Sequence, residues 1–192
     1  MATQLVNSPR AAETRARILA VAQHLFATKG YPNAGLREIA SEAGVVPSLV
    51  LKYFGSKAQL FEAALIASIL PIEEFQADRP RFGETVVYSV LNRDVAILAP
   101  AMIALSLGEA RSREISARVV RRQVIDPIAL WLQKEGDTSD LLARSVSIFL
   151  MTTGFALGAR SMDLGLDDET TSRVVGRFIH AIQSMVDSPL PD

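Results

Sequence analysis

The side chains that most often carry enzyme chemistry are few in this 192-residue chain, and they are not grouped. There is no cysteine, which excludes disulfides and thiolate metal sites and fits a reducing compartment. His24 and His180 fall in different predicted helices, and the acidic pairs Glu73-Glu74 and Asp167-Asp168 adjoin predicted helix ends, where charges are common. No glycine-rich phosphate loop precedes a helix. We therefore expect no cofactor, no metal and no enzyme.

Basic side chains suited to binding an anion concentrate near the N-terminus. Residues 1–63 carry a net charge of +3, against −4 for the remainder. A basic head on an acidic body favours binding of a polyanion through the head. Lys52 and Lys57 belong to this basic head, on the predicted helices 47–54 and 56–70.

Helices must position these residues, because apolar side chains recur at helical spacing in nearly every segment. Hydrophobic residues make up 49% of the chain, and no Asn-Gly or Asp-Gly hairpin signal occurs. We predict an all-α fold of about nine helices, with a three-helix head containing a helix-turn-helix and a C-terminal helical bundle. The expected helices cover roughly 14–28, 36–43, 47–54, 56–70, 84–98, 101–109, 112–134, 139–162 and 168–187. Pro127 should kink or split the 112–134 helix.

Two of these helices, 36–43 and 47–54, are short and joined by a glycine-containing turn, as in a helix-turn-helix. Gly44 should end the first in the left-handed conformation. In the second helix, Val50 and Phe54 are four residues apart and suit the core. Another face carries Ser48, Leu51 and Lys52. A Ser-x-x-Gln capping box, Ser56 to Gln59, should begin the next helix.

The residues in and around this motif resemble the signature of TetR-family transcriptional regulators. The matching segments are FATKGY at 26–31, LREIASEAGV at 36–45 and LVLKYFGSKAQLF at 49–61. The resemblance covers about residues 14–65. It is specific because the helix lengths, the turn glycine, the aromatic pair and the Ser-Lys cap all occur at the spacing that the family has. It implies a DNA-binding domain over 1–65 and a ligand-sensing and dimerisation domain over 66–192.

The resemblance further implies that the 47–54 helix enters the major groove of operator DNA. It assigns phosphate contacts to Tyr53, to Lys57 and to the N-terminus of the helix that Lys57 begins, where free N–H groups favour anions. Lys52 suits a guanine edge or a phosphate, and Leu51 suits a thymine methyl group. The full candidate set is Arg37, Val46, Pro47, Ser48, Leu51, Lys52, Tyr53 and Lys57.

Some of these positions depart from the family pattern, which leaves open which of them carry each contact. The family usually has Ser or Thr at Val46, where the residue caps the helix and contacts phosphate, and often at Ala34 and Gly35. It commonly has Gly at Ser48 and Tyr at Leu51.

The C-terminal helices carry two further candidate sets. In the family, the terminal helices form a four-helix bundle with a second subunit, and packing within one chain is the alternative. The interface candidates are Ser147, Leu150, Gly154, Leu157, Ser161, Phe178, Ile182 and Met185. Large side chains that could line an apolar ligand pocket are Tyr88, Met102, Trp131, Phe149, Met151 and Phe155.

The most apolar stretch, Ser145 to Ala159, is shorter than the roughly 20 residues that a membrane-spanning helix needs. Met1 to Arg10 lacks the apolar core of a signal peptide. We therefore expect a cytoplasmic protein that makes no membrane contact, with the apolar stretch forming a buried or interfacial helix.

These observations predict a transcriptional regulator that binds a near-palindromic operator as a homodimer. The simplest mode is a repressor released by a small apolar or amphipathic effector. Two alternatives remain: an all-helical enzyme or carrier that merely contains a helix-turn-helix, and a DNA-binding protein whose body only dimerises. The effector, the operator sequence and the choice between repressor and activator are not determined by the sequence.

Overall fold

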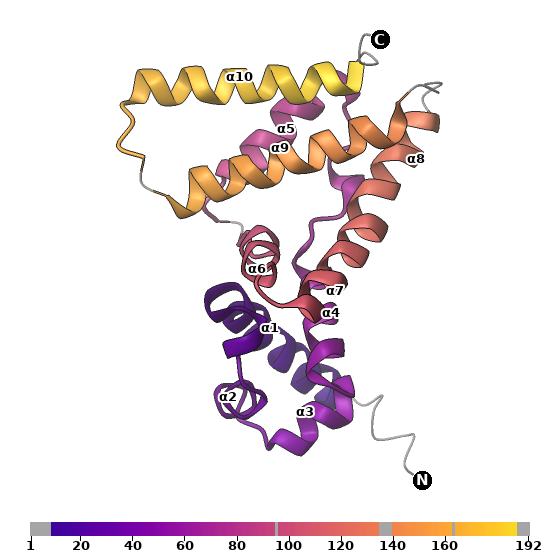
Figure 1. Ribbon diagram of the computed structural model, residues 1–192, viewed down its shortest axis with the longest axis vertical. Helices are drawn as coiled ribbons and strands as arrows, with labels where there is room; N and C mark the ends of the chain where they lie inside the picture. The colour runs from indigo at the N-terminus through magenta and orange to yellow at the C-terminus, as the bar shows by residue number, and fades with distance from the viewer. Residues whose placement is uncertain (1–8, 95, 135–139, 163, 188–192) are drawn as a thin grey trace. The chain divides into compact units, whose positions relative to one another are not determined.

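A computed structural model describes residues 9–94, 96–134, 140–162 and 164–187 (Figure 1). Within these ranges the chain is helical and contains no strand, which confirms the predicted all-α class. The described residues form two compact units. The first comprises the residues up to Ile69 together with Ala101–Val119, and the second comprises Leu70–Pro100 with the residues from Val120 onward.

The first unit is built on four N-terminal helices, and parts of two later helices join it. The helices are α1 (Pro9–Asn33), α2 (Leu36–Glu42), α3 (Pro47–Phe54), α4 (Lys57–Ser68), α6 (Ala99–Ser106) and α7 (Ala110–Val120). Helix α1 begins at Pro9 rather than near residue 14, and α4 ends at Ser68 rather than near residue 70. The joining of residues 101–119 to this unit is a long-range contact that helical periodicity does not reveal.

The core of the first unit follows the apolar spacing of its helices. Phe26 of α1 and Phe61 of α4 meet edge to face with ring centroids 5.1 Å apart, and Tyr31 packs against both rings. Gly30 interrupts α1 with φ +75°, and a Cβ there would lie 3.3 Å from Leu105. Glycine is therefore favoured at this position by its positive φ, and the close neighbour adds to that preference.

The second unit contains α5 (Phe82–Leu91), α8 (Asp126–Lys134), α9 (Leu141–Ser161) and α10 (Asp168–Asp187), with 3₁₀ turns at Ile72–Glu74 and Arg79–Arg81. Helix α10 has the predicted bounds. Helix α5 stops at Leu91 rather than near residue 98, and the Arg160 guanidinium donates to the carbonyls of Val90 (3.0 Å) and Asn92 (2.6 Å) at its end.

The predicted 112–134 helix, expected to kink or split at Pro127, changes its hydrogen-bonding pattern just before this proline. A π-helical segment, Arg121–Ile125, separates α7 from α8, and Pro127 lies in the first turn of α8. Proline lacks the N–H that an uninterrupted α-helix needs at this point, and its ring would crowd the preceding turn. A wider π turn before the proline relieves both problems.

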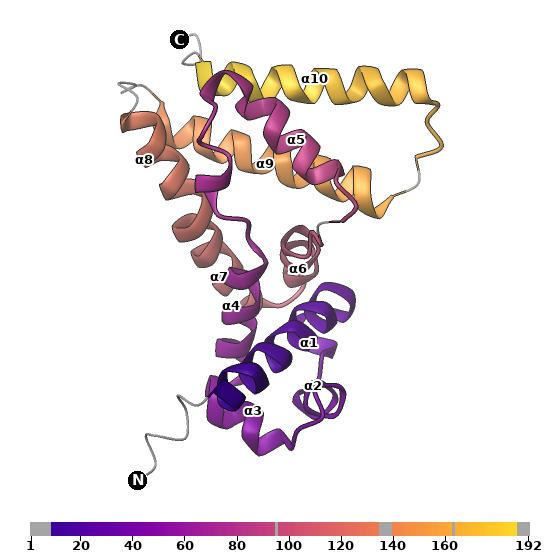
Figure 2. The ribbon, with the colours of Figure 1, turned by 180° about the vertical axis from the view of Figure 1, so that it is seen from behind.

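Helices α5 and α10 lie next to each other (Figure 2). Gly83 of α5 brings them unusually close. A Cβ on Gly83 would meet the carbonyl oxygen of Ile179 and would lie 2.9 Å from the backbone nitrogen of Gln183. The Gln183 side chain in turn accepts a hydrogen bond from the Gly83 N–H (2.9 Å). Nearby, the Phe82 and Trp131 rings stack at 4.9 Å, so bulky aromatic packing begins directly beside the close helix contact.

Helix α9 is apolar but poorly covered. The segment Leu141–Arg160 has a mean hydropathy of 1.5 and is long and apolar enough to cross a membrane by length and composition, and only 28% of its most apolar window is buried. Most α9 residues are half-buried, so of the two expected forms, buried or interfacial, the fully buried one does not describe this helix within one chain. Its N-terminal Arg144 is fully buried and donates to the carbonyls of Met185 (2.6 Å) and Val186 (2.7 Å) at the end of α10.

Candidate nucleic-acid interface

Helices α2 and α3 lie side by side and are joined by a tight turn, as the sequence predicted (Figures 1 and 2). Gly44 adopts φ +65°, and the Val45 N–H donates to the Ala40 carbonyl at 2.9 Å, which closes the end of α2. The Arg17 Nε of α1 donates to the Ala43 carbonyl at 2.8 Å. The turn is therefore held by its own backbone and by a side chain of α1.

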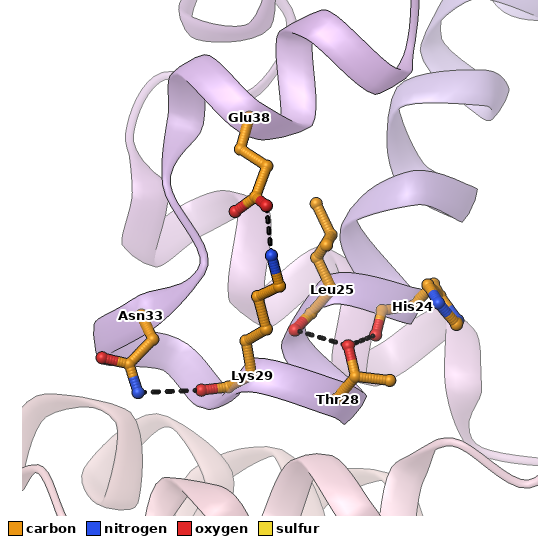
Figure 3. Close-up of polar contacts among 6 residues, drawn as sticks. All are labelled: His24, Leu25, Thr28, Lys29, Asn33 and Glu38. Atoms are coloured by element: carbon orange, nitrogen blue, oxygen red, sulfur yellow. Dashed lines mark hydrogen bonds and ion pairs between the residues drawn. The ribbon is translucent and has the colours of Figure 1, made fainter.

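Helix α2 is also fastened to the C-terminal part of α1 (Figure 3). Lys29 of α1 forms an ion pair with Glu38 of α2. This hydrogen bond raises the pKa of Lys29 and lowers the pKa of Glu38. The Asn33 side-chain amide donates to the Lys29 carbonyl at 3.1 Å. Lys29, which contributes to the basic charge of the head, thus has a structural partner that the sequence pattern did not reveal.

Helix α3 has one buried face and one exposed face, in agreement with the spacing of its residues. Val50 and Phe54 are buried in the unit, and Arg15 of α1 lies over the Phe54 ring at 4.8 Å. The exposed residues are Val46, Pro47, Ser48, Leu51 and Lys52. Helix α3 and its N-cap residue therefore present five exposed residues, while the opposite face of the helix is packed against the unit.

The side chains on this surface differ in their freedom to meet a ligand. Lys52 has no hydrogen bond or ion pair to any part of the chain that the structure describes. Arg37, on α2, is exposed, whereas Tyr53 is half-buried. Among the basic candidates on α3 and α4, Lys52 is the one positioned to meet an anion without first losing an internal contact.

Lys57, at the start of α4, is engaged internally. Its Nζ donates to the Pro32 carbonyl at 3.1 Å and lies 4.8 Å from the centroid of the Tyr31 ring. Burial lowers the pKa of Lys57, and the nearby Glu109 carboxylate partly opposes this effect. Lys57 must give up contacts to α1 before it can bind a phosphate.

The N-terminus of α4 only partly follows the predicted capping box. The Ser56 hydroxyl accepts the Gln59 N–H at 3.2 Å, as expected. The Gln59 side chain, however, accepts from the Ser56 hydroxyl at 3.0 Å instead of reaching the Ser56 N–H. That N–H is instead bonded to the Phe54 carbonyl, because the turn at Gly55, with φ +77°, directs it there.

The predicted pocket residues come from both units. Met102 belongs to the first unit, where its sulfur accepts from Ser68 at 3.7 Å, and the other five belong to the second unit. Tyr88 is 53% exposed on a shallow groove along α5, lined by Arg81, Glu84, Thr85, Tyr88, Ser89 and Asn92. Trp131 and Phe155 are buried in the core of the second unit, whereas Phe149 and Met151 are half-buried. The exposure of Tyr88 argues against an enclosed pocket around it, and the assignment of the other five residues stays a prediction.

The predicted interface residues also divide. Leu150 is 60% exposed and Gly154 is exposed, whereas Ser147 and Leu157 are half-buried. Ile182 of α10 is completely buried in its own core, so its assignment to an interface is wrong. Phe178 and Met185 are half-buried and pack against that core. The side chain of Ser161 lies outside the described residues. The two exposed candidates, Leu150 and Gly154, both lie on α9.

Together these features define the class of the molecule: a helix-turn-helix DNA-binding fold attached to a helical body. Residues 18–64 match the family model described as "Bacterial regulatory proteins, tetR family". The chain is 36% identical to the uncharacterized HTH-type transcriptional regulator TtgW of Pseudomonas putida, over 45% of this chain and 66% of the relative. It is 31% identical to the HTH-type transcriptional repressor BepR of Brucella suis, over 44% of this chain and 41% of the relative.

Similarity to a solved structure extends over more of the chain. A putative TetR-family regulator from Rhodococcus sp. superimposes with a TM-score of 0.71 at 18% identity, covering 92% of this chain and 100% of the other. At that identity the similarity establishes the fold. Residues 18–64 therefore carry a DNA-binding domain of the TetR family of bacterial regulators, and the chain spans 66% and 41% of the length of the two curated relatives.

Proposed function

We propose that this protein is a ligand-responsive repressor that binds a near-palindromic operator as a homodimer and releases it when a small apolar or amphipathic molecule binds. The observation that carries the proposal is the exposed face of α3, whose opposite face is packed into the first unit through Val50 and Phe54. We assign DNA binding to residues 1–65, and sensing and dimerisation to 66–192. Such a protein would act in the cytoplasm, where the chromosome is accessible.

DNA binding follows from the chemistry of the head. A recognition helix inserted into the major groove brings Ser48, Leu51 and Lys52 to the base edges. Lys57 and the N-terminus of α4 would contact the phosphates, as would Tyr53 and Arg37. For Lys57 this contact replaces its bond to the Pro32 carbonyl. We therefore expect Lys52 to contribute more to affinity than Lys57.

Dimerisation would cover the outer face of α9. Its exposed part combines Leu150 with Gly154, and a Cβ added to Gly154 would meet nothing within 4 Å. An apolar helix that is only partly covered in one chain gains free energy when a second copy buries its exposed residues. Small residues allow two helices to approach closely. Two heads would then read half-sites roughly 34–36 Å apart, one turn of the groove.

Effector release would operate through α4. Within the first unit, Glu62 of α4 pairs with Arg118 of α7 at 3.0 Å, and Ser68 of α4 donates to Met102 of α6 at 3.7 Å. Helices α6 and α7 continue in sequence into the second unit. A ligand that favours another position of these helices would shift α4, and with it the base of α3. Such coupling typically changes operator affinity about 5–150-fold.

The decisive experiment is selection of bound fragments from the host genome with the purified full-length protein. We expect enrichment of a near-palindromic sequence, with binding that weakens steeply as salt rises. Neighbouring genes would then suggest candidate effectors. These compounds would be titrated while Trp131 fluorescence and operator binding are followed together. Absence of any enriched sequence would refute the proposal, and tight compound binding that leaves operator affinity unchanged would refute its sensor part.

A further inference from the structure

The surface of α3 is unusually apolar for one that meets a polyanion. Val46 is 62% exposed and Leu51 is 43% exposed, and Pro47 is exposed as well. The polar side chains on this surface are Ser48 and Lys52. Lysine only donates hydrogen bonds, and serine offers a single hydroxyl.

This inventory restricts what the helix can read. Adenine is usually read by Asn or Gln and cytosine by Glu or Asp, and none of these four types occurs on the exposed surface of α3. Lys52 can donate to the acceptor atoms of guanine. The remaining distinctive group in the major groove is the C5-methyl of thymine, which is apolar. Val46 and Leu51 match it in chemistry.

Val46 also makes the unbound protein less stable than a capping residue at this position would. It occupies the N-cap position of α3, where a Ser, Thr, Asp or Asn side chain would accept a free N–H of the first turn. No side chain caps α3 in the structure. Because Val46 is largely exposed, packing does not compensate for the missing cap. A partner that buries the Val46 side chain would stabilise it by the packing that the unbound protein does not provide.

We propose that Val46 and Leu51 determine operator specificity by contacting the methyl groups of two thymines in each half-site. This inference rests on the proposed DNA binding and adds to it the chemical group that is read. Each contact removes an exposed aliphatic side chain and a thymine methyl from water together.

The test uses the selected operator with deoxyuridine replacing thymine, one symmetric pair of positions at a time. Uracil differs from thymine only by the methyl group, so base pairing is retained. At two positions per half-site we expect affinity to fall about 3- to 5-fold per methyl group, as for one buried methyl group. The symmetric pair should therefore weaken binding about 10- to 25-fold.

Variant proteins assign each methyl to its residue. Leu51→Ala should bind the thymine and uracil operators equally at one of these positions, and Val46→Ala should do so at the other. Ser48→Ala, a change on the same surface, should keep both uracil effects. All three residues are exposed, and thermal melting would verify that each variant is folded.

The outcomes separate this inference from the proposed function. If no specific operator is found, the proposed DNA binding fails. If a specific operator is bound but no uracil substitution weakens binding, the methyl contacts are refuted while the regulator stands. The same conclusion follows if uracil sensitivity persists unchanged in both Val46→Ala and Leu51→Ala.

Discussion

Helices α3 and α9 both expose aliphatic side chains to water, but their surroundings differ. On α3, Val46 and Leu51 lie beside the free ammonium group of Lys52. On α9, Leu150 and Gly154 have no charged neighbour on their own helix, because Arg144 is buried and Arg160 is bonded to the end of α5. An apolar surface with a free cation suits a polyanion that carries methyl groups. An apolar surface without charge suits another copy of itself.

The largest effect is expected from Gly154→Leu on α9. A Cβ at this position meets nothing within 4 Å and Gly154 is exposed, so we expect the fold to persist, as thermal melting would verify. In a dimer it would meet the partner twice by symmetry, and overpacking costs about 1–3 kcal/mol per site. Sedimentation equilibrium should show dimerisation weakened on the order of 100-fold.

Gly108→Leu is the matched control, since a Cβ there also meets nothing and Gly108 lies outside α9. It should dimerise as the parent does. Equal dimerisation by Gly154→Leu and the parent would exclude this face of α9 from the interface.

The next effect concerns the cation that distinguishes α3 from α9. Lys52→Ala should weaken operator binding about 10- to 50-fold, as expected for loss of one charged contact in each half-site. If Lys52 binds phosphate, the log–log salt slope should become shallower by about 1.8 for the two subunits. If it reads guanine, sequence preference at that position should relax. Anisotropy titrations at several salt concentrations distinguish the two.

Lys57→Ala provides the comparison for Lys52→Ala. Its effect on affinity should be smaller, because the parent Lys57 must first leave the Pro32 carbonyl and the Tyr31 ring. A larger effect for Lys57→Ala than for Lys52→Ala would contradict this ranking of the two lysines.

The smallest effect tests whether Val46 is unfavourable for folding. Val46→Ser introduces an N-cap on α3 and should increase the free energy of unfolding by about 1 kcal/mol, measured by urea denaturation. Operator affinity should fall at the same time, since the aliphatic group is lost. Ser56→Ala is the reciprocal control, because Ser56 does cap α4 and its loss should destabilise by a similar amount. Unchanged stability in Val46→Ser would show that the N-terminus of α3 does not need a side-chain cap.

Local features of this fold could be predicted from the sequence because they depend on residues only a few positions apart. The left-handed Gly44, the Ser56 cap, the buried pair Val50 and Phe54 and the bounds of α10 follow from hydrogen bonds and periodicity within one or two helical turns. The helix-turn-helix also has a recognisable signature, because its short helices and turn must keep one register. The exposed surface of α3 follows from the same periodicity.

The tertiary structure alone decided the contacts between distant segments. Lys29 forms an ion pair with Glu38, and Lys57 donates a hydrogen bond to the Pro32 carbonyl. Gly83 allows α10 to pack closely against α5, and residues 101–119 join the first unit. Spacing along one helix shows which face is apolar but not whether that face meets its own chain or a partner. For this reason the sequence placed Ile182 and Gly154 in the same set of interface candidates. In the structure Ile182 is buried in the core, whereas Gly154 is exposed.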